Sequence, residues 1–159
     1  MIFVTLGSQK FQFNRLLEKI DKLVLEGIIK NYVFAQTGYS DYIPQNYQYK
    51  QFLNRDEFLE IENKADIVVT HGGTGAIIGA VKQNKKVIAV PRLKEYGEHV
   101  DNHQIQLLKQ FDDLGIIEVC YNVENLDKAF TNVFNTSYNR YYSNTKKIIT
   151  SIENYLKTL

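Results

Sequence analysis

The chain has 159 residues, 44% of them hydrophobic and 23% charged, which is the composition and length of a single globular domain. Nineteen basic residues against eighteen acidic ones leave a net charge of +1, so no electrostatic feature points to a nucleic-acid partner. A single cysteine, Cys120, excludes an internal disulfide and a multi-cysteine metal site, and it suits a reducing compartment. Because the N-terminal apolar run is too short for a signal peptide or a spanning helix, we expect a cytoplasmic protein.

The first half of the sequence predicts strands that alternate with helices. Residues 2–6 form an apolar run closed by Gly7 and Ser8, and apolar side chains then recur at helical spacing over residues 13–24. Residues 32–36 and 47–52 predict two more strands, and Asn54 is placed to cap a short helix. The unbroken apolar run 65–70 is typical of a parallel strand covered on both faces, and a glycine-rich loop follows it.

The second half continues the same pattern. A helix is predicted to about residue 83, a buried strand over 86–90, and a helix from near Val100 that ends before Gly115. Residues 116–119 predict a last strand and 126–134 another helix. The chain closes with a helical pattern over about 138–159, whose apolar stripe we expect to pack mainly on the sheet while leaving room for a partner. No linker interrupts the pattern, so we expect one domain over 1–159.

Strands alternating with helices at these lengths predict an α/β fold with a Rossmann-like, doubly wound parallel sheet. Such sheets bind ligands beyond the carboxyl ends of their strands. The loops that begin at Gly7 and at His71, and the loop after Pro91, each follow a strand directly. We therefore expect all three loops at the ligand-binding edge.

The loop His71-Gly72-Gly73-Thr74-Gly75 carries the strongest chemical signal. Its glycines let the backbone approach a ligand closely, and the following helix presents free N–H groups and the positive end of its dipole, which together suit a diphosphate. The spacing is not that of the dinucleotide fingerprint, and the lysine of a P-loop is absent. Two interpretations stay open: a phosphate-binding loop, or glycines that only relieve crowding at a turn.

Side chains around this loop extend the candidate site. His71 either donates a hydrogen bond to a phosphate or makes a structural hydrogen bond to the backbone. Gly7 and Ser8 lie at the same predicted edge and are expected to face the cleft.

A second group of hydrogen-bonding side chains surrounds the helix start near residue 100. Asp101, Asn102 and Gln104, with Glu95 nearby, could orient the hydroxyls of a sugar. His99 and His103 are four residues apart, which on a helix is metal-ligand spacing and opens the alternative of a metal-dependent hydrolase. A capped and solvated helix start is the structural alternative. No third ligand is fixed by the sequence, so we expect no metal.

Three motifs, in this order, carry a family resemblance: residues 65–75, residues 85–91 and residues 98–104. Together they resemble the C-terminal, donor-binding domain of glycosyltransferase family 28, over nearly the whole chain. The similarity is greatest to stand-alone versions of that domain. These are the catalytic subunits of eukaryotic UDP-N-acetylglucosamine transferases and the bacterial subunits that often add galactose to lipid-linked capsule or exopolysaccharide precursors.

The resemblance implies the C-terminal half of a GT-B enzyme that binds a UDP-sugar without a cofactor and transfers a hexose with inversion. We expect galactose, added to a lipid-linked saccharide acceptor in exopolysaccharide or capsule biosynthesis. Transfer of N-acetylglucosamine and a non-catalytic nucleotide-sugar-binding module are the alternatives. A separate, membrane-associated partner is implied for the acceptor half. It would hold this chain at the inner face of the membrane, and the isolated chain could form a homodimer.

The resemblance also assigns roles to residues. Gly72, Gly73, Thr74 and Gly75 match the diphosphate loop, and Asp101 and Gln104 match positions that face the donor sugar. His71, His99 and Glu98 are the candidates for the catalytic base. One departure concerns the ribose: bacterial N-acetylglucosaminyltransferases hold it with an acidic residue after the glycine loop, where the rough register puts Ile78. Glu95 or Glu98 is the expected substitute.

Overall fold

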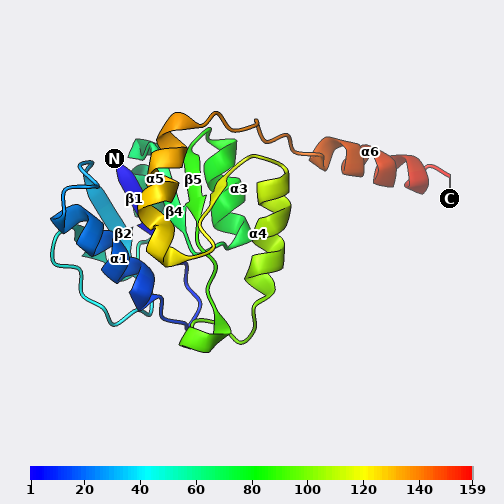
Figure 1. The fold of residues 1–159 in the computed structure, drawn as a ribbon. Helices are drawn as coiled ribbons and strands as arrows, with labels where there is room; N and C mark the ends of the chain where they lie inside the picture. The colour runs from blue at the N-terminus through cyan, green and yellow to red at the C-terminus, as the bar shows by residue number, and fades with distance from the viewer. Residues whose placement is uncertain (159) are drawn as a thin grey trace.

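The computed structural model describes residues 1–158 as a parallel six-stranded sheet with helices on both faces and a last helix that stands apart (Figure 1). The strands are β1 (Ile2–Thr5), β2 (Val33–Gln36), β3 (Gln48–Lys50), β4 (Ile67–Thr70), β5 (Lys86–Ala89) and β6 (Glu118–Val119). The helices are α1 (Asn14–Leu25), α2 (Arg55–Lys64), α3 (Thr74–Lys82), α4 (His103–Asp113), α5 (Leu126–Asn135) and α6 (Thr145–Leu156), with short 3-10 helices η1 (Lys94–Tyr96) and η2 (Val123–Asn125).

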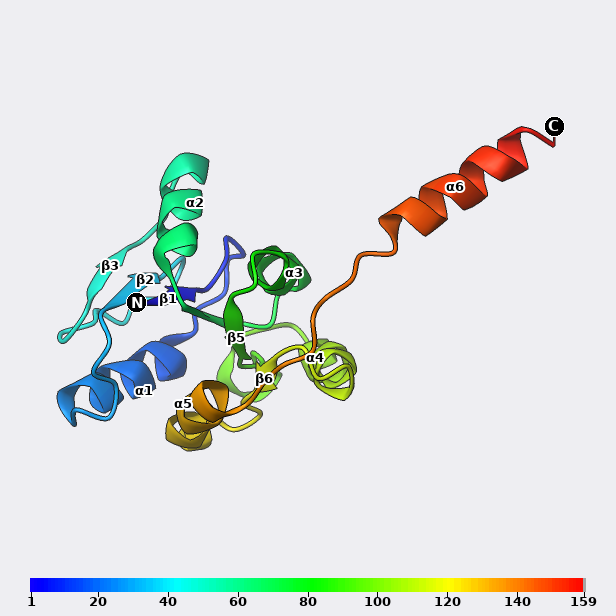
Figure 2. The same ribbon diagram turned by 90° about the horizontal axis from the view of Figure 1, so that it is seen from above.

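The strand order is β3-β2-β1-β4-β5-β6, and all pairs are parallel, which confirms the predicted Rossmann-like, doubly wound sheet. Successive residues of a strand point to opposite faces of the sheet, so they belong to two separate hydrophobic cores. Val4, for example, packs with α1 and α5, whereas Phe3 packs with α2, α3 and α4. Figure 2 shows α1 and α5 on the face opposite α2 and α3. The direction of the order reverses between β1 and β4, so the ligand crevice of such sheets is expected at their carboxyl ends.

Most helices and strands begin and end within one or two residues of the positions predicted from local sequence signals. Asn54 caps α2 in a capping box, since its side chain accepts from the Glu57 amide and the Glu57 side chain accepts from its own amide. The largest shift among the inner helices is at α4, which begins at His103 and not near Val100. That shift matters for the site, because it leaves the preceding residues in a loop.

The closing helix differs from the prediction in extent and in packing. It begins only at Thr145, none of its residues is buried, and it projects away from the sheet (Figures 1 and 2). The predicted Leu159 lies outside the described residues. Both faces of the sheet are already covered by other helices, so the expectation that the stripe packs on the sheet is wrong. Within residues 1–158, no helix has both the length and the apolar character needed to cross a bilayer.

Candidate functional site

The two glycine-bearing loops meet where the strand order reverses. Thr5 of β1 pairs with Thr70 of β4, so the chain leaves both strands at the same height, at Gly7 and at His71. Gly7 and Gly72 have φ of +69° and +85°, a backbone conformation that favours glycine. The predicted neighbourhood of the two loops is therefore present, with left-handed turns that need these residues.

The imidazole of His71 lies between the loops. A Cβ atom built on Gly7 would be 2.8 Å from its Cε1, and one built on Gly73 would be 2.6 Å from its Nε2. The His71 Nδ1 lies 3.4 Å from the Thr5 carbonyl oxygen and 3.4 Å from Thr70 Oγ1. Any side chain at position 7 or 73 would collide with the His71 ring. The close approach of this ring therefore explains why both positions are glycine.

Burial lowers the pKa of His71 to about 4, and the nearby positive charge of Arg92 lowers it further, against a raising effect of the Thr5 carbonyl. The imidazole is therefore neutral at neutral pH. A neutral ring between two loops can accept or donate one hydrogen bond at each nitrogen without adding charge to the site.

The N-terminus of α3 is open. The first helical amide with an intrahelical partner is that of Ile77, which donates to the Gly73 carbonyl at 3.1 Å. The amides of Thr74, Gly75 and Ala76 precede it, and the N-cap Gly73 has no side chain to accept from them. Thr74 and Gly75 are exposed, and a Cβ atom on Gly75 would meet nothing within 4 Å. This is the geometry of an anion-binding helix end.

A groove of about 640 Å³ continues from this helix end between α2 and α3. Gly7, Ser8, His71, Gly73 and Gly75 line it at the loops, and Leu53, Phe58 and Leu59 form an apolar wall on the α2 side. On α3, Gly79 lines the groove and Ile78 does not. Glu95 and Glu98, the expected substitutes, do not line it.

Glu98 is fixed in a buried ion pair. Its carboxylate, 1% exposed, accepts from Arg15 Nε at 2.6 Å and Nη2 at 3.0 Å, and it also accepts from the Leu93 amide at 2.9 Å. Arg15 Nη2 donates to the Pro91 carbonyl as well. Glu98 therefore fastens the loop after β5 to α1, and its two oxygens are occupied.

Three of the remaining predicted polar residues, Asp101, Asn102 and Gln104, hold the backbone of the loop after β5, and none of them lines the groove. Gln104 accepts from the Arg92 amide at 2.9 Å, and Asn102 accepts from the Lys94 amide at 2.9 Å. Asp101 accepts from the His103 amide at 3.0 Å. That bond, with the His99 ring close by, lowers the pKa of Asp101. Glu95 is exposed on η1.

His99 precedes α4, so His99 and His103 do not share a helical face, and the spacing argument for a metal site fails. The His99 ring packs 5.3 Å from the Phe11 ring, and its Nδ1 lies 3.1 Å from Asp101 Oδ1. Among residues 1–158, no three side chains of His, Cys, Asp or Glu are grouped to hold a metal ion.

Arg92 is a functional neighbour that the sequence interpretation missed. Its side chain is fully buried, and its Nη2 donates to the carbonyl oxygens of Leu6 at 2.9 Å and Phe11 at 3.1 Å. Burial lowers its pKa to about 10, although Glu98 acts in the opposite direction. Arg92 thus holds the loop after β1 through two backbone carbonyls. In the sequence, only its position directly after Pro91 could have indicated this role.

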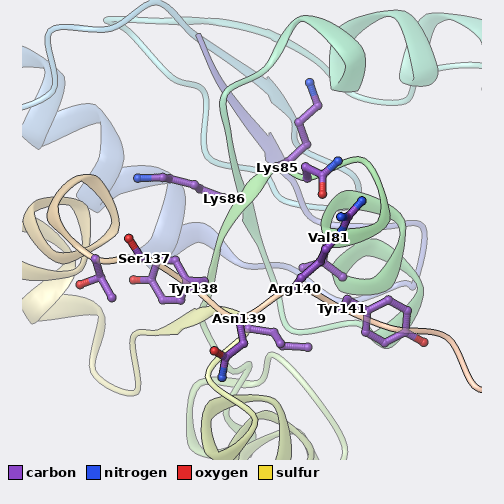
Figure 3. Close-up of a pocket in the computed structure, with 11 residues that line it drawn as sticks. Val81, Lys85, Lys86, Ser137, Tyr138, Asn139, Arg140 and Tyr141 are labelled. Atoms are coloured by element: carbon purple, nitrogen blue, oxygen red, sulfur yellow. The ribbon is translucent and has the colours of Figure 1, made fainter.

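A second hollow, of about 540 Å³, lies at the opposite edge of the sheet (Figure 3). Lys85, Lys86 and the segment 136–141 line it. The Lys86 Nζ donates to the Val133 carbonyl at 2.8 Å, and the Lys85 Nζ donates to the Asn63 carbonyl at 2.6 Å. Both ammonium groups therefore satisfy carbonyls at helix C-termini.

Comparisons with known proteins show which proteins the chain is similar to in sequence and in fold. The mouse protein named UDP-N-acetylglucosamine transferase subunit ALG13 is 26% identical over 125 residues, which are 74% of this chain and 10% of that protein. This chain therefore spans only a small part of that relative.

Two solved structures share the fold. An NMR structure of ALG13 has a TM-score of 0.57 at 18% identity and covers 89% of both chains. The glycotransferase of kitacinnamycin has a TM-score of 0.59 at 18% identity, covering 83% of this chain and 34% of the other. These likenesses show the predicted fold of a GT-B half. The model of the glycosyltransferase family 28 C-terminal domain matches residues 1–159, and the chain belongs to that family.

Proposed function

We propose that this chain is the donor-binding, catalytic subunit of a UDP-sugar glycosyltransferase. The observation that carries the proposal is the open N-terminus of α3 at the head of the groove. There the amides of Thr74, Gly75 and Ala76 can donate to diphosphate oxygens. The apolar wall formed by Leu53 and Phe58 offers a surface for the nucleoside.

In the proposed reaction, an acceptor hydroxyl attacks the anomeric carbon from the side opposite UDP. The new glycosidic C–O bond forms as the bond to the diphosphate breaks, and the electron pair of that bond leaves with UDP. The amides and the dipole of α3 stabilise the charge on the departing diphosphate, so the proposal needs no metal ion.

The proposal retains His99 as the base that removes the acceptor proton. Glu98 is held by Arg15, and a pKa of about 4 makes His71 a weak base at neutral pH. The His99 ring is oriented by the Asp101 carboxylate, an arrangement that favours one tautomer. His99→Asn should lower kcat in the complete enzyme while leaving UDP affinity unchanged, and an unchanged kcat would move the base to the partner.

The donor sugar is a hexose in this proposal, and two candidates come from different observations. The similarity to UDP-N-acetylglucosamine transferase subunit ALG13 favours N-acetylglucosamine. The resemblance to bacterial capsule and exopolysaccharide subunits favours galactose. Asp101→Ala should reduce discrimination between the two UDP-sugars more than it reduces affinity for UDP, and equal losses would remove Asp101 from the sugar site.

A membrane-associated partner subunit would bring the lipid-linked acceptor to the groove. The exposed stripe Ile148, Ile149, Ile152, Tyr155 and Leu156 on α6 supports this part of the proposal. Such a stripe on a projecting helix is the kind of surface that a second protein covers. A homodimer through α6 is the competing outcome, and the molar mass of the isolated chain in solution distinguishes the two.

The test is titration calorimetry of the full chain with UDP, UDP-galactose and UDP-N-acetylglucosamine, with GDP as the mismatched nucleotide. Gly75→Val adds a side chain to open space at the helix end, so it should reduce UDP affinity at least about tenfold with little change in stability. Ser151→Val on exposed α6 is the matched control and should leave UDP affinity unchanged.

Unchanged UDP affinity in a folded Gly75→Val variant would refute the diphosphate assignment. UDP binding without sugar transfer, after the partner and a lipid-linked acceptor are added, would leave a nucleotide-sugar-binding module.

A further inference from the structure

The side chains that line the groove offer a diphosphate little positive charge. Within residues 1–158, the charged side chains that line it are Arg55 and Glu62, whose charges cancel, and the low pKa of His71 leaves that imidazole neutral at neutral pH. The dipole of α3 contributes the equivalent of only about half an elementary charge. A cation close behind the loops would therefore strengthen diphosphate binding in the absence of a metal ion.

Arg92 is a buried cation without an acidic partner of its own. Its side chain is 1% exposed, and its Nε and Nη1 are buried with no hydrogen-bond partner in the part of the chain that the structure describes. The carboxylate of Glu98 is bound by Arg15 instead. Burial lowers the pKa of Arg92 only to about 10, so the guanidinium is charged at neutral pH. A buried cation with unfilled donors lowers stability, and proteins accept such costs mainly at functional sites.

Arg92 lies directly behind the loop that begins at Gly7. Its Nη2 donates to the Leu6 carbonyl at 2.9 Å, whereas Gly7 and Ser8, but not Arg92, line the groove. Because a trans peptide turns its N–H opposite to its C=O, the Gly7 amide points away from Arg92, and it has no hydrogen-bond partner within residues 1–158. A hydrogen bond from a charged donor polarises this peptide, so the Gly7 N–H becomes a stronger donor.

The guanidinium is also close to the end of α3. A Cβ atom on Gly7 or on Gly73, the N-cap of α3, would collide with the His71 ring, so this one ring separates the two loops. After burial, the charge of Arg92 is the largest cause that lowers the pKa of His71, ahead of the charge of His99. Protein and not bulk water lies between these groups, so solvent screens the field of Arg92 only weakly there.

We propose that Arg92 is a positioning residue for the diphosphate of the donor. It fixes the Leu6–Gly7 peptide so that the Gly7 amide is available to phosphate oxygens, and it adds a positive charge behind that amide. The inference rests on the proposed function, because it places the diphosphate at the glycine loops. Arg92 itself is too deeply buried to touch the ligand, so its effect passes through the peptide and through its electric field.

The experiment measures the affinity of the full chain for UDP by calorimetry and for uridine, which lacks the phosphates, by ligand-observed NMR. Arg92→Gln removes the charge but keeps a side-chain donor, so it should weaken UDP binding about tenfold and change uridine binding less than about twofold. Arg92→Lys keeps the charge and should retain UDP affinity within about threefold. Lys94→Gln removes the same charge from an exposed position in the loop after β5; as the matched control, it should change UDP affinity less than about twofold.

The pKa of His71, followed by NMR in the same variants, reports the charge independently of binding. It should rise in Arg92→Gln and stay near the wild-type value in Arg92→Lys, because the charge of Arg92 lowers it. Arg92→Met is the neutral variant to use if Arg92→Gln does not fold.

Unchanged UDP affinity in a folded neutral variant would overturn the inference. Equal losses of UDP affinity in the neutral variant and in Arg92→Lys would do the same, as would equal losses for UDP and uridine. A larger loss in Arg55→Gln than in the neutral Arg92 variant would assign the charge to Arg55. Absence of any UDP binding to the wild-type chain would instead refute the proposed function.

Discussion

The enclosed position of His71 makes a strong prediction for Gly73→Ala. The added methyl group would lie 2.6 Å from His71 Nε2 and 2.9 Å from Cε1, whereas ordinary contacts are 3.4 Å or longer. The ring cannot retreat easily, because Gly7 closes its other side and the Thr5 carbonyl lies at Nδ1. Overpacking of this kind costs about 1–3 kcal/mol. We expect Gly73→Ala to lower the free energy of unfolding by that amount.

A double-mutant cycle in urea shows whether the His71 ring is the cause. His71→Ala alone should destabilise the chain by about 2 kcal/mol, because it leaves a cavity. In the double variant, the methyl group at position 73 uses the vacated space. The double variant should therefore be more stable than the sum of the two losses by at least about 1 kcal/mol.

Gly75→Ala is the matched control in the same loop. A Cβ atom there meets nothing within 4 Å, and alanine is the better helix former by about 1 kcal/mol, so the control should be as stable as the wild type or more so. Additive losses in the cycle, or a Gly73→Ala chain with wild-type stability, would refute the reasoning.

Three further predictions concern the buried charges and the closing helix. Arg15→Ala should cost about 3 kcal/mol in urea unfolding, since it strands the Glu98 carboxylate in the interior, whereas Lys109→Ala, in an exposed pair, should cost less than about 0.5 kcal/mol. Because the pKa of His71 is depressed from 6.5 to about 4 on folding, the unfolded chain binds more protons between these values; stability should fall by about 3 kcal/mol as the pH drops through that window. His71→Asn should remove that part of the slope, and an unchanged slope would contradict the burial argument. Truncation after Ser143 should leave the melting temperature within about 2 °C, because α6 buries none of its residues.

Patterns within single elements were readable from the sequence. The apolar run before His71 predicted a fully buried parallel strand, and β4 is buried at all four positions. Asn54 predicted the start of α2, and the glycine loop predicted an open helix end. Each of these signals depends on residues close together in the chain, because backbone conformation and the burial of one face determine which residue types occur there.

The α4 start shows where such local signals stop. Val100 continues an apolar pattern that suggests helix, yet it is exposed and lies in the loop before His103. The loop takes its shape from Glu98, which Arg15 binds across more than eighty residues of sequence. Between Glu98 and α4, Asn102 accepts from the Lys94 amide and Asp101 accepts from the His103 amide, and these bonds hold the backbone in a loop.

The sequence alone was sufficient for the order of strands and helices, the family, and the edge of the sheet where the glycine loops meet. Tertiary structure decided which side chains share that edge: the His71 ring lies between Gly7 and Gly73. It also decided that α6 packs on neither face of the sheet. Periodicity reports that a face is apolar, but the surface that covers the face depends on contacts between distant segments, which have no local pattern.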